Sequence, residues 1–210
     1  MVSVNSRTSC KLRAVLCDLG GVIALFDEET IRKRLEKIAR RSLDEPGVGQ
    51  AFVEELFRFE RGELEPGEFF ERTNDILGLR VDYDEFVRVW EDNFWLNPRA
   101  VEELKRLRRR FRLVLVSNTD PLHWRHIDRT FEVGKLFDEL VLSYEVGAIK
   151  PDRRMFVVAL QKAGVEAQEA LYVDDLEENV RAAAEIGMST LLYTPEVSIV
   201  EAVRSEGCDV

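Results

Sequence analysis

Three short apolar runs in this chain each end in side chains that can handle phosphate or a metal ion: Asp18, Ser117, and the pair Asp174 and Asp175. A lone Lys150, followed by proline, lies between the last two runs. Runs of about five apolar residues are typical of buried parallel strands, whose carboxyl ends line the ligand crevice of an open α/β sheet. Carboxylates, a hydroxyl and an ammonium at one sheet edge suit Mg²⁺ and a phosphoryl group.

Asp18 is the residue expected to react, because it closes the strand predicted to be central. A carboxylate there can attack phosphorus and form an aspartyl-phosphate, which splits one difficult displacement into two easier ones. The attack brings two anions together, so a cation must offset the repulsion, and Mg²⁺ meets that need. Asp174 and Asp175 are the expected further ligands. Adjacent side chains on extended backbone point opposite ways, but the chain turns at the end of a strand, so only one of the two need contact the ion. Asp174 is the favoured one.

The oxygens of the transferring phosphoryl group also need hydrogen-bond donors to hold them. The Ser117 hydroxyl and the Lys150 ammonium are expected to hold them, with the backbone N–H of Asn118 close to the start of the next helix. Leu19, which begins the turn after Asp18, is also expected to bind the phosphate.

The periodicity of the chain predicts where these residues sit. Helical spacing dominates from about residue 27 to residue 95, with helices expected near 31–39, 48–60, 66–77 and 83–93 and no strand-like run. From residue 98 helices alternate with the strands at 113–117, 140–142, 170–174 and 190–193. This rhythm predicts right-handed crossovers and a doubly wound parallel sheet, of the α/β class. The expected domains are a catalytic core of residues 1–26 and 96–210 and an inserted α-helical cap of residues 27–95.

The composition of the chain limits the kinds of molecule that it is expected to bind. A formal net charge of -10 argues against nonspecific binding to nucleic acid or anionic membranes. No apolar stretch reaches membrane-spanning length, and residues 1–11 lack the apolar middle of a signal peptide, so the cytoplasm is expected. The three cysteines show no metal-ligand spacing, and nothing in the sequence indicates an oxidising compartment. No obligate protein partner is evident.

The order of the motifs resembles that of the haloacid dehalogenase-like superfamily: CDLGGV around Asp18, VSNT at Ser117, IKPD at Lys150 and YVDDLEEN at Asp174. The resemblance covers the whole chain, including a helical cap inserted after the first motif. It implies a Rossmann-like core, an aspartate nucleophile and Mg²⁺-dependent hydrolysis of phosphate esters. The acidic pair in YVDD favours the metal-dependent phosphatase branch over true dehalogenases.

Gly20 departs from that pattern. Phosphatases of this family typically carry a second Asp there, which serves as general acid and base. The Gly20 carbonyl can still ligate Mg²⁺, but glycine cannot donate a proton, and such help is worth about 10²–10⁴-fold in rate. The loss should matter least for anomeric, acyl and aryl phosphates, whose leaving groups are stable without a proton.

A second resemblance favours a sugar 1-phosphate. FERGEL at residues 59–64, SNTDPLH at residues 117–123 and the glycine at position 20 are similar to a bacterial branch that hydrolyses α-glucose 1-phosphate. Glu60 and Arg61 are therefore candidates for sugar contacts, with a helix-end charge pair as an equal alternative. Asp120 is expected to cap a helix rather than to replace the missing acid. The predicted function is a Mg²⁺-dependent phosphomonoesterase acting on a small phosphorylated metabolite.

Three alternatives stay open. A non-catalytic phosphate-binding or regulatory module would bind Mg²⁺ and phosphate without turnover. A 2-haloacid dehalogenase would use Asp18 without metal and would not need Asp174. A phosphosugar mutase would release an isomer rather than free phosphate.

Overall fold

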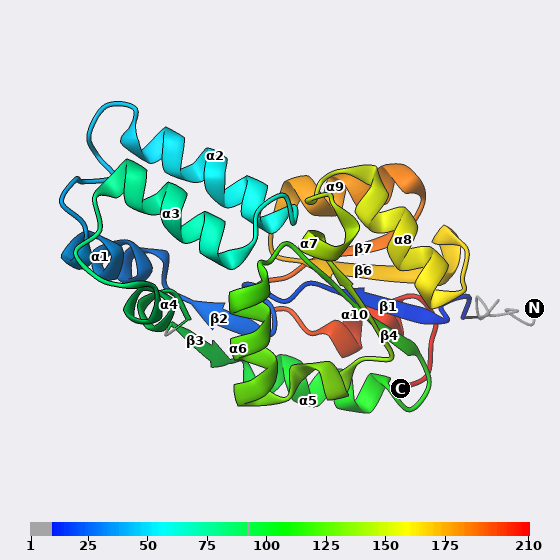
Figure 1. Ribbon diagram of the computed structural model, residues 1–210. Helices are drawn as coiled ribbons and strands as arrows, with labels where there is room; N and C mark the ends of the chain where they lie inside the picture. The colour runs from blue at the N-terminus through cyan, green and yellow to red at the C-terminus, as the bar shows by residue number, and fades with distance from the viewer. Residues whose placement is uncertain (1–9, 92) are drawn as a thin grey trace, which may run out of the picture.

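A five-stranded parallel sheet lies at the centre of the computed structural model, which describes residues 10–91 and 93–210 (Figure 1). The strand order is β5-β4-β1-β6-β7. Leu16 in the central strand pairs with Val114 on one side and Tyr172 on the other. The predicted α/β class and doubly wound parallel sheet are confirmed. The strands are β1 (Ala14–Cys17), β4 (Arg112–Ser117), β5 (Glu139–Leu142), β6 (Ala170–Asp174) and β7 (Ser189–Leu192).

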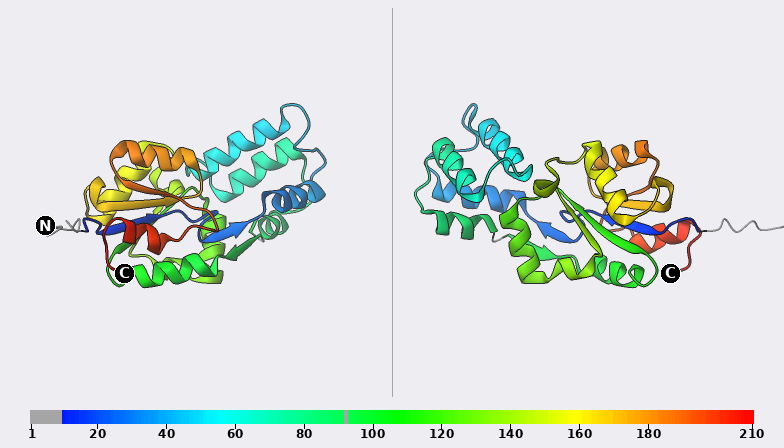
Figure 2. Two further views of the ribbon diagram at one scale, coloured as in Figure 1. Left: turned by 180° about the vertical axis from the view of Figure 1, so that it is seen from behind. Right: turned by 45° about the vertical axis from the view of Figure 1, so that its right-hand side comes forward.

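Helices cover both faces of this sheet (Figure 2). Successive residues of a strand point to opposite faces, so Val15 and Cys17 belong to one hydrophobic cluster and Ala14 and Leu16 to another. The first cluster is completed by α5 (Pro98–Leu107), α6 (Pro121–Phe131) and α10 (Ile199–Ser205). The second is completed by α8 (Arg153–Ala163) and α9 (Glu177–Ile186), while the short α7 (Ser143–Val146) follows β5. Burial on both faces explains why every sheet residue of β1 is apolar.

Four helices between β2 and β3 form a third hydrophobic cluster beside the sheet (Figure 1). Aromatic rings fill it; the rings of Phe59 and Phe69 stack with their centroids 4.4 Å apart, and Trp90 packs 5.2 Å from Phe69. Leu122 of α6 belongs to the same cluster, so this core is shared with the sheet domain. The helices are α1 (Glu28–Ile38), α2 (Val48–Glu60), α3 (Pro66–Leu77) and α4 (Tyr83–Glu91). They are called the inserted helices below; their division from the rest at residues 27 and 95 stays a prediction.

A two-stranded antiparallel ribbon joins the inserted helices to the sheet. It consists of β2 (Ala24–Phe26) and β3 (Phe94–Leu96), with Leu25 opposite Trp95. The expectation that no strand occurs up to residue 95 was therefore wrong, because three-residue strands are too short to show a period in the sequence. Asn97 fixes the end of the ribbon: its Nδ2 donates to the carbonyl of Val22 at 2.9 Å and to the hydroxyl of Tyr193 at 2.8 Å.

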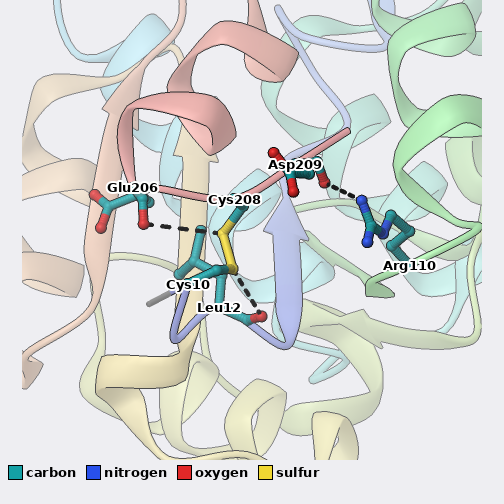
Figure 3. Close-up of a disulfide and its surroundings, with 6 residues drawn as sticks. All are labelled: Cys10, Leu12, Arg110, Glu206, Cys208 and Asp209. Atoms are coloured by element: carbon teal, nitrogen blue, oxygen red, sulfur yellow. Dashed lines mark hydrogen bonds between the residues drawn. A yellow bond between two sulfur atoms is a disulfide. The ribbon is translucent and has the colours of Figure 1, made fainter. Parts of the chain in front are cut away.

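A disulfide joins Cys10 to Cys208, with their Cα atoms 4.7 Å apart (Figure 3). Close by, Arg110 Nη1 donates a hydrogen bond of 2.7 Å to the carbonyl of Asp209. The bond was not predicted, and it is one feature that does point toward oxidising conditions, in which such bonds usually form. The third cysteine, Cys17, is buried with a free thiol. Within the described ranges, no helix is both long and apolar enough to span a membrane.

Candidate active site

The parallel register brings the predicted reactive residues to one edge of the sheet. Asp18 follows β1 directly, Ser117 is the last residue of β4, and Asp174 is the last residue of β6. Since β1 lies between β4 and β6, these three side chains share the carboxyl edge of neighbouring strands. All three are buried, Asp18 to 7% exposure and Asp174 completely.

Lys150 lies between the two carboxylates. Its Nζ is 2.7 Å from Oδ1 of Asp18 and 2.8 Å from Oδ2 of Asp174. Asn118 holds the backbone of Lys150: its Nδ2 donates to the Lys150 carbonyl at 3.1 Å, and its Oδ1 accepts from the Lys150 N–H at 2.7 Å. The peptide bond between Lys150 and Pro151 is cis. From the sequence, only the backbone N–H of Asn118 was expected to act, as a donor to phosphate. The structure shows in addition that the side chain of Asn118 positions Lys150.

Asp174 is surrounded by donors. Its carboxylate accepts hydrogen bonds from Lys150, from the hydroxyl of Tyr172, from Nδ2 of Asn179 at 3.1 Å to both oxygens, and from the backbone N–H of Leu176 at 2.9 Å. Burial alone would raise the pKa of Asp174, but the Lys150 ammonium and these hydrogen bonds outweigh it and lower that pKa. Asp174 is therefore held as an anion, which is the state a metal ligand needs.

The pKa values of Asp18 and Asp175 are shifted in the opposite direction. Burial, opposed by Lys150 and reinforced by the charge of Asp174, raises the pKa of Asp18 to about 7. Burial and the same Asp174 charge raise the pKa of Asp175. The backbone N–H of Leu19 donates to Oδ1 of Asp18 at 2.6 Å. One ammonium does not balance three neighbouring carboxylates, so the site has room for a further positive charge.

The donor set fits a hard cation. Oxygens of Asp18, Asp174 and Asp175 all lie within 4.8 Å of one another. Carboxylate oxygens are the ligands that Mg²⁺ prefers in proteins. Gly21 makes room for this cluster, because a Cβ at its position would lie 2.0 Å from Oδ2 of Asp175 and its φ of +67° disfavours other residues. The cluster can therefore bind a metal ion, with the carbonyl of Gly20 as the further ligand proposed from the sequence.

The space beside Gly20 is taken by an aromatic ring. A Cβ at position 20 would lie 3.2 Å from Cε1 of Phe26 in β2. A side chain at position 20 would therefore pack tightly against this ring, which would have to shift slightly to make room for it.

A cavity of about 530 Å³ is lined by residues of both the sheet edge and the inserted helices. Gly20, Ser117 and Asn118 contribute from the sheet side, and aromatic residues such as Phe52 and Trp90 contribute from the inserted helices. Glu60, at the last position of α2, lines this cavity, and its role as a substrate contact stays a prediction. Its neighbour does not: Arg61 is 2.6 Å from Glu63 and is not among the described residues that line the cavity. For Arg61 the structure agrees with the alternative of a helix-end charge pair.

Asp120 forms a buried unit with two aromatic residues that the sequence analysis did not connect. Its Oδ1 accepts from the backbone N–H groups of Leu122 and His123 at 2.9 Å, which confirms the predicted helix cap. Its Oδ2 accepts from Nε1 of Trp90 at 3.2 Å and lies 2.7 Å from Nδ1 of His123. His123 Nε2 lies 3.0 Å from the Trp90 carbonyl, and the two rings stack with centroids 4.8 Å apart. This unit ties α6 to α4 of the inserted helices.

The chain belongs to the haloacid dehalogenase-like hydrolase family, whose model matches residues 12–187. The predicted family is confirmed, and with it the expectation of a hydrolase of the phosphatase branch. The particular closeness to α-glucose 1-phosphate phosphatases is not confirmed.

Two curated relatives are phosphatases. A D-ribitol-5-phosphate phosphatase of Bacteroides thetaiotaomicron is 28% identical over 196 residues, which cover 88% of this chain and 92% of that protein. A glyceraldehyde 3-phosphate phosphatase of Methanopyrus kandleri is also 28% identical over 196 residues, covering 86% of this chain and 83% of the relative.

A solved structure shows the same fold. A HAD family enzyme of Bacteroides thetaiotaomicron, crystallised with magnesium and inorganic phosphate, superposes with a TM-score of 0.77 at 26% identity. The match covers 90% of this chain and 98% of that enzyme.

Proposed function

We propose that this chain is a Mg²⁺-dependent phosphomonoesterase that hydrolyses a small phosphorylated sugar or polyol through an aspartyl-phosphate on Asp18. The observation that carries the proposal is the placement of Lys150 between Asp18 and Asp174, with Asp175 close enough to complete a cation site. A nucleophilic carboxylate, a fixed ammonium and a metal site at one edge are the groups that phosphoryl transfer requires.

The residues divide the work as follows. Asp18 attacks phosphorus, while Ser117, the N–H of Asn118 and Lys150 hold the phosphoryl oxygens. Bound Mg²⁺ would neutralise charge on those oxygens, held by Asp18, the Gly20 carbonyl and Asp174 with Asp175 beside them. Water then hydrolyses the aspartyl-phosphate and regenerates the carboxylate. The inserted helices close the cavity and select the substrate through residues such as Glu60.

The substrate class is supported by the relatives. Both curated phosphatases are named for phosphorylated sugars or polyols, and the related solved enzyme was crystallised with magnesium and phosphate. The preference for a 1-phosphate, argued from Gly20, holds only as long as no other side chain can protonate the leaving oxygen. The cytoplasm stays a prediction.

The test is phosphate release from 4-nitrophenyl phosphate, α-glucose 1-phosphate and glucose 6-phosphate, each with Mg²⁺ and with chelator. We expect release that requires Mg²⁺ and disappears in the Asp18→Asn variant. Binding of Mg²⁺ and phosphate without release would support the regulatory module instead. Formation of an isomeric sugar phosphate would support a mutase, and halide release from a 2-haloacid without metal would support a dehalogenase.

A further inference from the structure

The reaction needs a proton donor that the sheet domain does not supply at the usual place. Gly20 has no side chain, and a Cβ built there would meet only the apolar ring of Phe26, with Cε1 at 3.2 Å. An alkoxide is a poor leaving group, so hydrolysis of an alkyl phosphate requires an acid within hydrogen-bond reach of the bridging oxygen. That acid has to come from another wall of the cavity.

Most other titratable side chains of the cavity are already engaged. Both ring nitrogens of His123 have partners, Asp120 and the Trp90 carbonyl. Arg32 forms a bidentate pair with Asp44, with N–O distances of 2.7 and 2.9 Å. Glu28 is exposed. Glu60 is partly buried, and no described residue forms a hydrogen bond or an ion pair with its carboxyl group.

The surroundings of Glu60 raise its pKa into the neutral range. Burial and the charge of Asp120 raise its pKa to about 7, although His123, Lys150 and Arg61 act in the opposite direction. A group that titrates near the working pH can both give and take a proton, which is the property an acid-base catalyst needs.

The end of α2 is fixed over the sheet domain (Figure 1). A Cβ on Gly62 would lie 2.1 Å from the carbonyl oxygen of Tyr144 in α7, so the turn that follows Glu60 touches the backbone of the sheet domain. Gly62 also has a φ of +68°, which lets the chain turn sharply just after the helix. This contact fixes the turn beside Glu60, which lines the same cavity as Ser117 and Asn118.

We propose that Glu60 is the general acid and base of this phosphatase, supplied by the inserted helices in place of the side chain absent at Gly20. The inference rests on the proposed function and deepens it. As Asp18 bonds to phosphorus, the bond from phosphorus to the leaving oxygen breaks, and the Glu60 proton passes to that oxygen to give an alcohol. The Glu60 carboxylate then takes a proton from water as the water oxygen bonds to phosphorus and the Asp18–phosphorus bond breaks. Primary alkyl phosphates thus become substrates alongside 1-phosphates.

The leaving group provides the test. Glu60→Gln keeps the size of the side chain but removes its transferable proton. With Mg²⁺ present, we expect kcat/KM on glucose 6-phosphate to fall about 10²-fold or more, and that on 4-nitrophenyl phosphate by less than about 10-fold, since nitrophenolate leaves without a proton. Glu63→Gln is the matched control, because it removes one negative charge from the same turn outside the cavity. Its ratio of the two rates should equal that of the wild type.

Equal losses on both esters, or no loss on either, would overturn the role of Glu60. Absence of phosphate release by the wild type from both esters would instead overturn the proposed function. A measurement on the wild type covers the case of a variant that does not fold. The rate on glucose 6-phosphate relative to that on the aryl ester should decline as pH rises through about 7 and Glu60 loses its proton. The ionisation of Asp18 affects both esters alike and cancels in this ratio. A ratio that does not change with pH would also contradict the proposal.

Discussion

The ammonium of Lys150 lies 2.7 Å from Oδ1 of Asp18, and both side chains are almost fully buried. Lys150 therefore supplies, from a loop rather than from the sheet, a positive charge that opposes the effect of burial on the pKa of Asp18. The pKa of Lys150 is raised: burial acts to lower it, but the charges of Asp18 and Asp174 outweigh that effect. The cation is thus present over the whole working pH range.

Replacing Lys150 by methionine should show what this charge contributes. Removing one partner of a buried ion pair typically costs about 3–5 kcal/mol, and loss of an oxyanion donor costs about 10²–10³ in kcat. We expect a lower free energy of unfolding in urea with chelator, and a smaller deficit with Mg²⁺, because a bound cation replaces part of the missing charge. An identical deficit with and without Mg²⁺ would argue against a metal site at Asp18 and Asp174.

Asn179→Ala should lower the affinity for Mg²⁺. Asn179 donates to both oxygens of Asp174 at 3.1 Å and is itself buried. Loss of a side chain that orients a metal ligand usually lowers metal affinity about 10–100-fold. The measurement is the Mg²⁺ concentration that gives half-maximal phosphate release. An unchanged concentration would mean that Asp174 is oriented without Asn179.

Gly21→Ala should abolish the cation site by displacing a carboxylate. The added Cβ would lie 2.0 Å from Oδ2 of Asp175, so that side chain has to move. We expect loss of Mg²⁺-dependent activity, measured alongside Gly67→Ala as a control. A Cβ at Gly67 meets nothing within 4 Å, and in the first turn of α3 the change should add about 0.4–1 kcal/mol of stability. Full activity in the Gly21 variant would show that Asp175 is not needed.

The Asp120–His123 pair predicts a pH dependence of stability. Burial acts to lower the pKa of His123, but the Asp120 charge and hydrogen bond outweigh it and raise that pKa; the same contacts outweigh burial and lower the pKa of Asp120. The histidine contribution is complete below its unfolded pKa of about 6.5 and disappears as pH rises through its higher folded value. The Asp120 contribution is complete above its unfolded pKa of about 3.9 and disappears as pH falls through its lower folded value.

His123→Gln should therefore be most destabilising between these limits, in mildly acidic solution. Thermal unfolding at a series of pH values measures the difference between wild type and variant. We expect that difference to shrink as the solution becomes alkaline. A constant difference at every pH would show that His123 acts by ring stacking on Trp90 alone.

Because of the disulfide, we expect reductant to lower the stability of the protein but not its activity. A bond between residues 198 positions apart restricts the unfolded chain strongly, and such bonds typically contribute about 2–4 kcal/mol. Cys208→Ser, or the wild type with reductant, should unfold at lower denaturant concentration while phosphate release at 25 °C stays the same. Equal unfolding midpoints with and without reductant would contradict a stabilising role.

The strands β1, β4 and β6 could be predicted because each is a short apolar run closed by a polar residue. Asp18, Ser117 and Asp174 sit where those runs end, so parallel pairing alone brings them together. The position of Lys150 could be predicted from its order among the motifs. The hydrogen bonds from the Asn118 side chain to the Lys150 backbone could not, because a contact between residues 32 positions apart leaves no local pattern in the sequence.

Other features depend on contacts across the fold. The Asp120–His123–Trp90 unit joins α6 to α4, and no spacing in the sequence relates His123 to a tryptophan 33 positions earlier. The ribbon of β2 and β3 pairs two three-residue segments separated by all four inserted helices. Glu60 and Arg61 are adjacent in the sequence, but the end of α2 directs only Glu60 into the cavity.

The bond between Cys10 and Cys208 closes nearly the entire chain into a covalent ring (Figure 3). All sheet strands, the proposed catalytic residues and the inserted helices belong to that ring, since they lie between residues 10 and 208. A single cut in the exposed loop between α1 and α2 would therefore open the ring without separating two pieces. The nicked protein would migrate as one chain until a reductant releases its fragments.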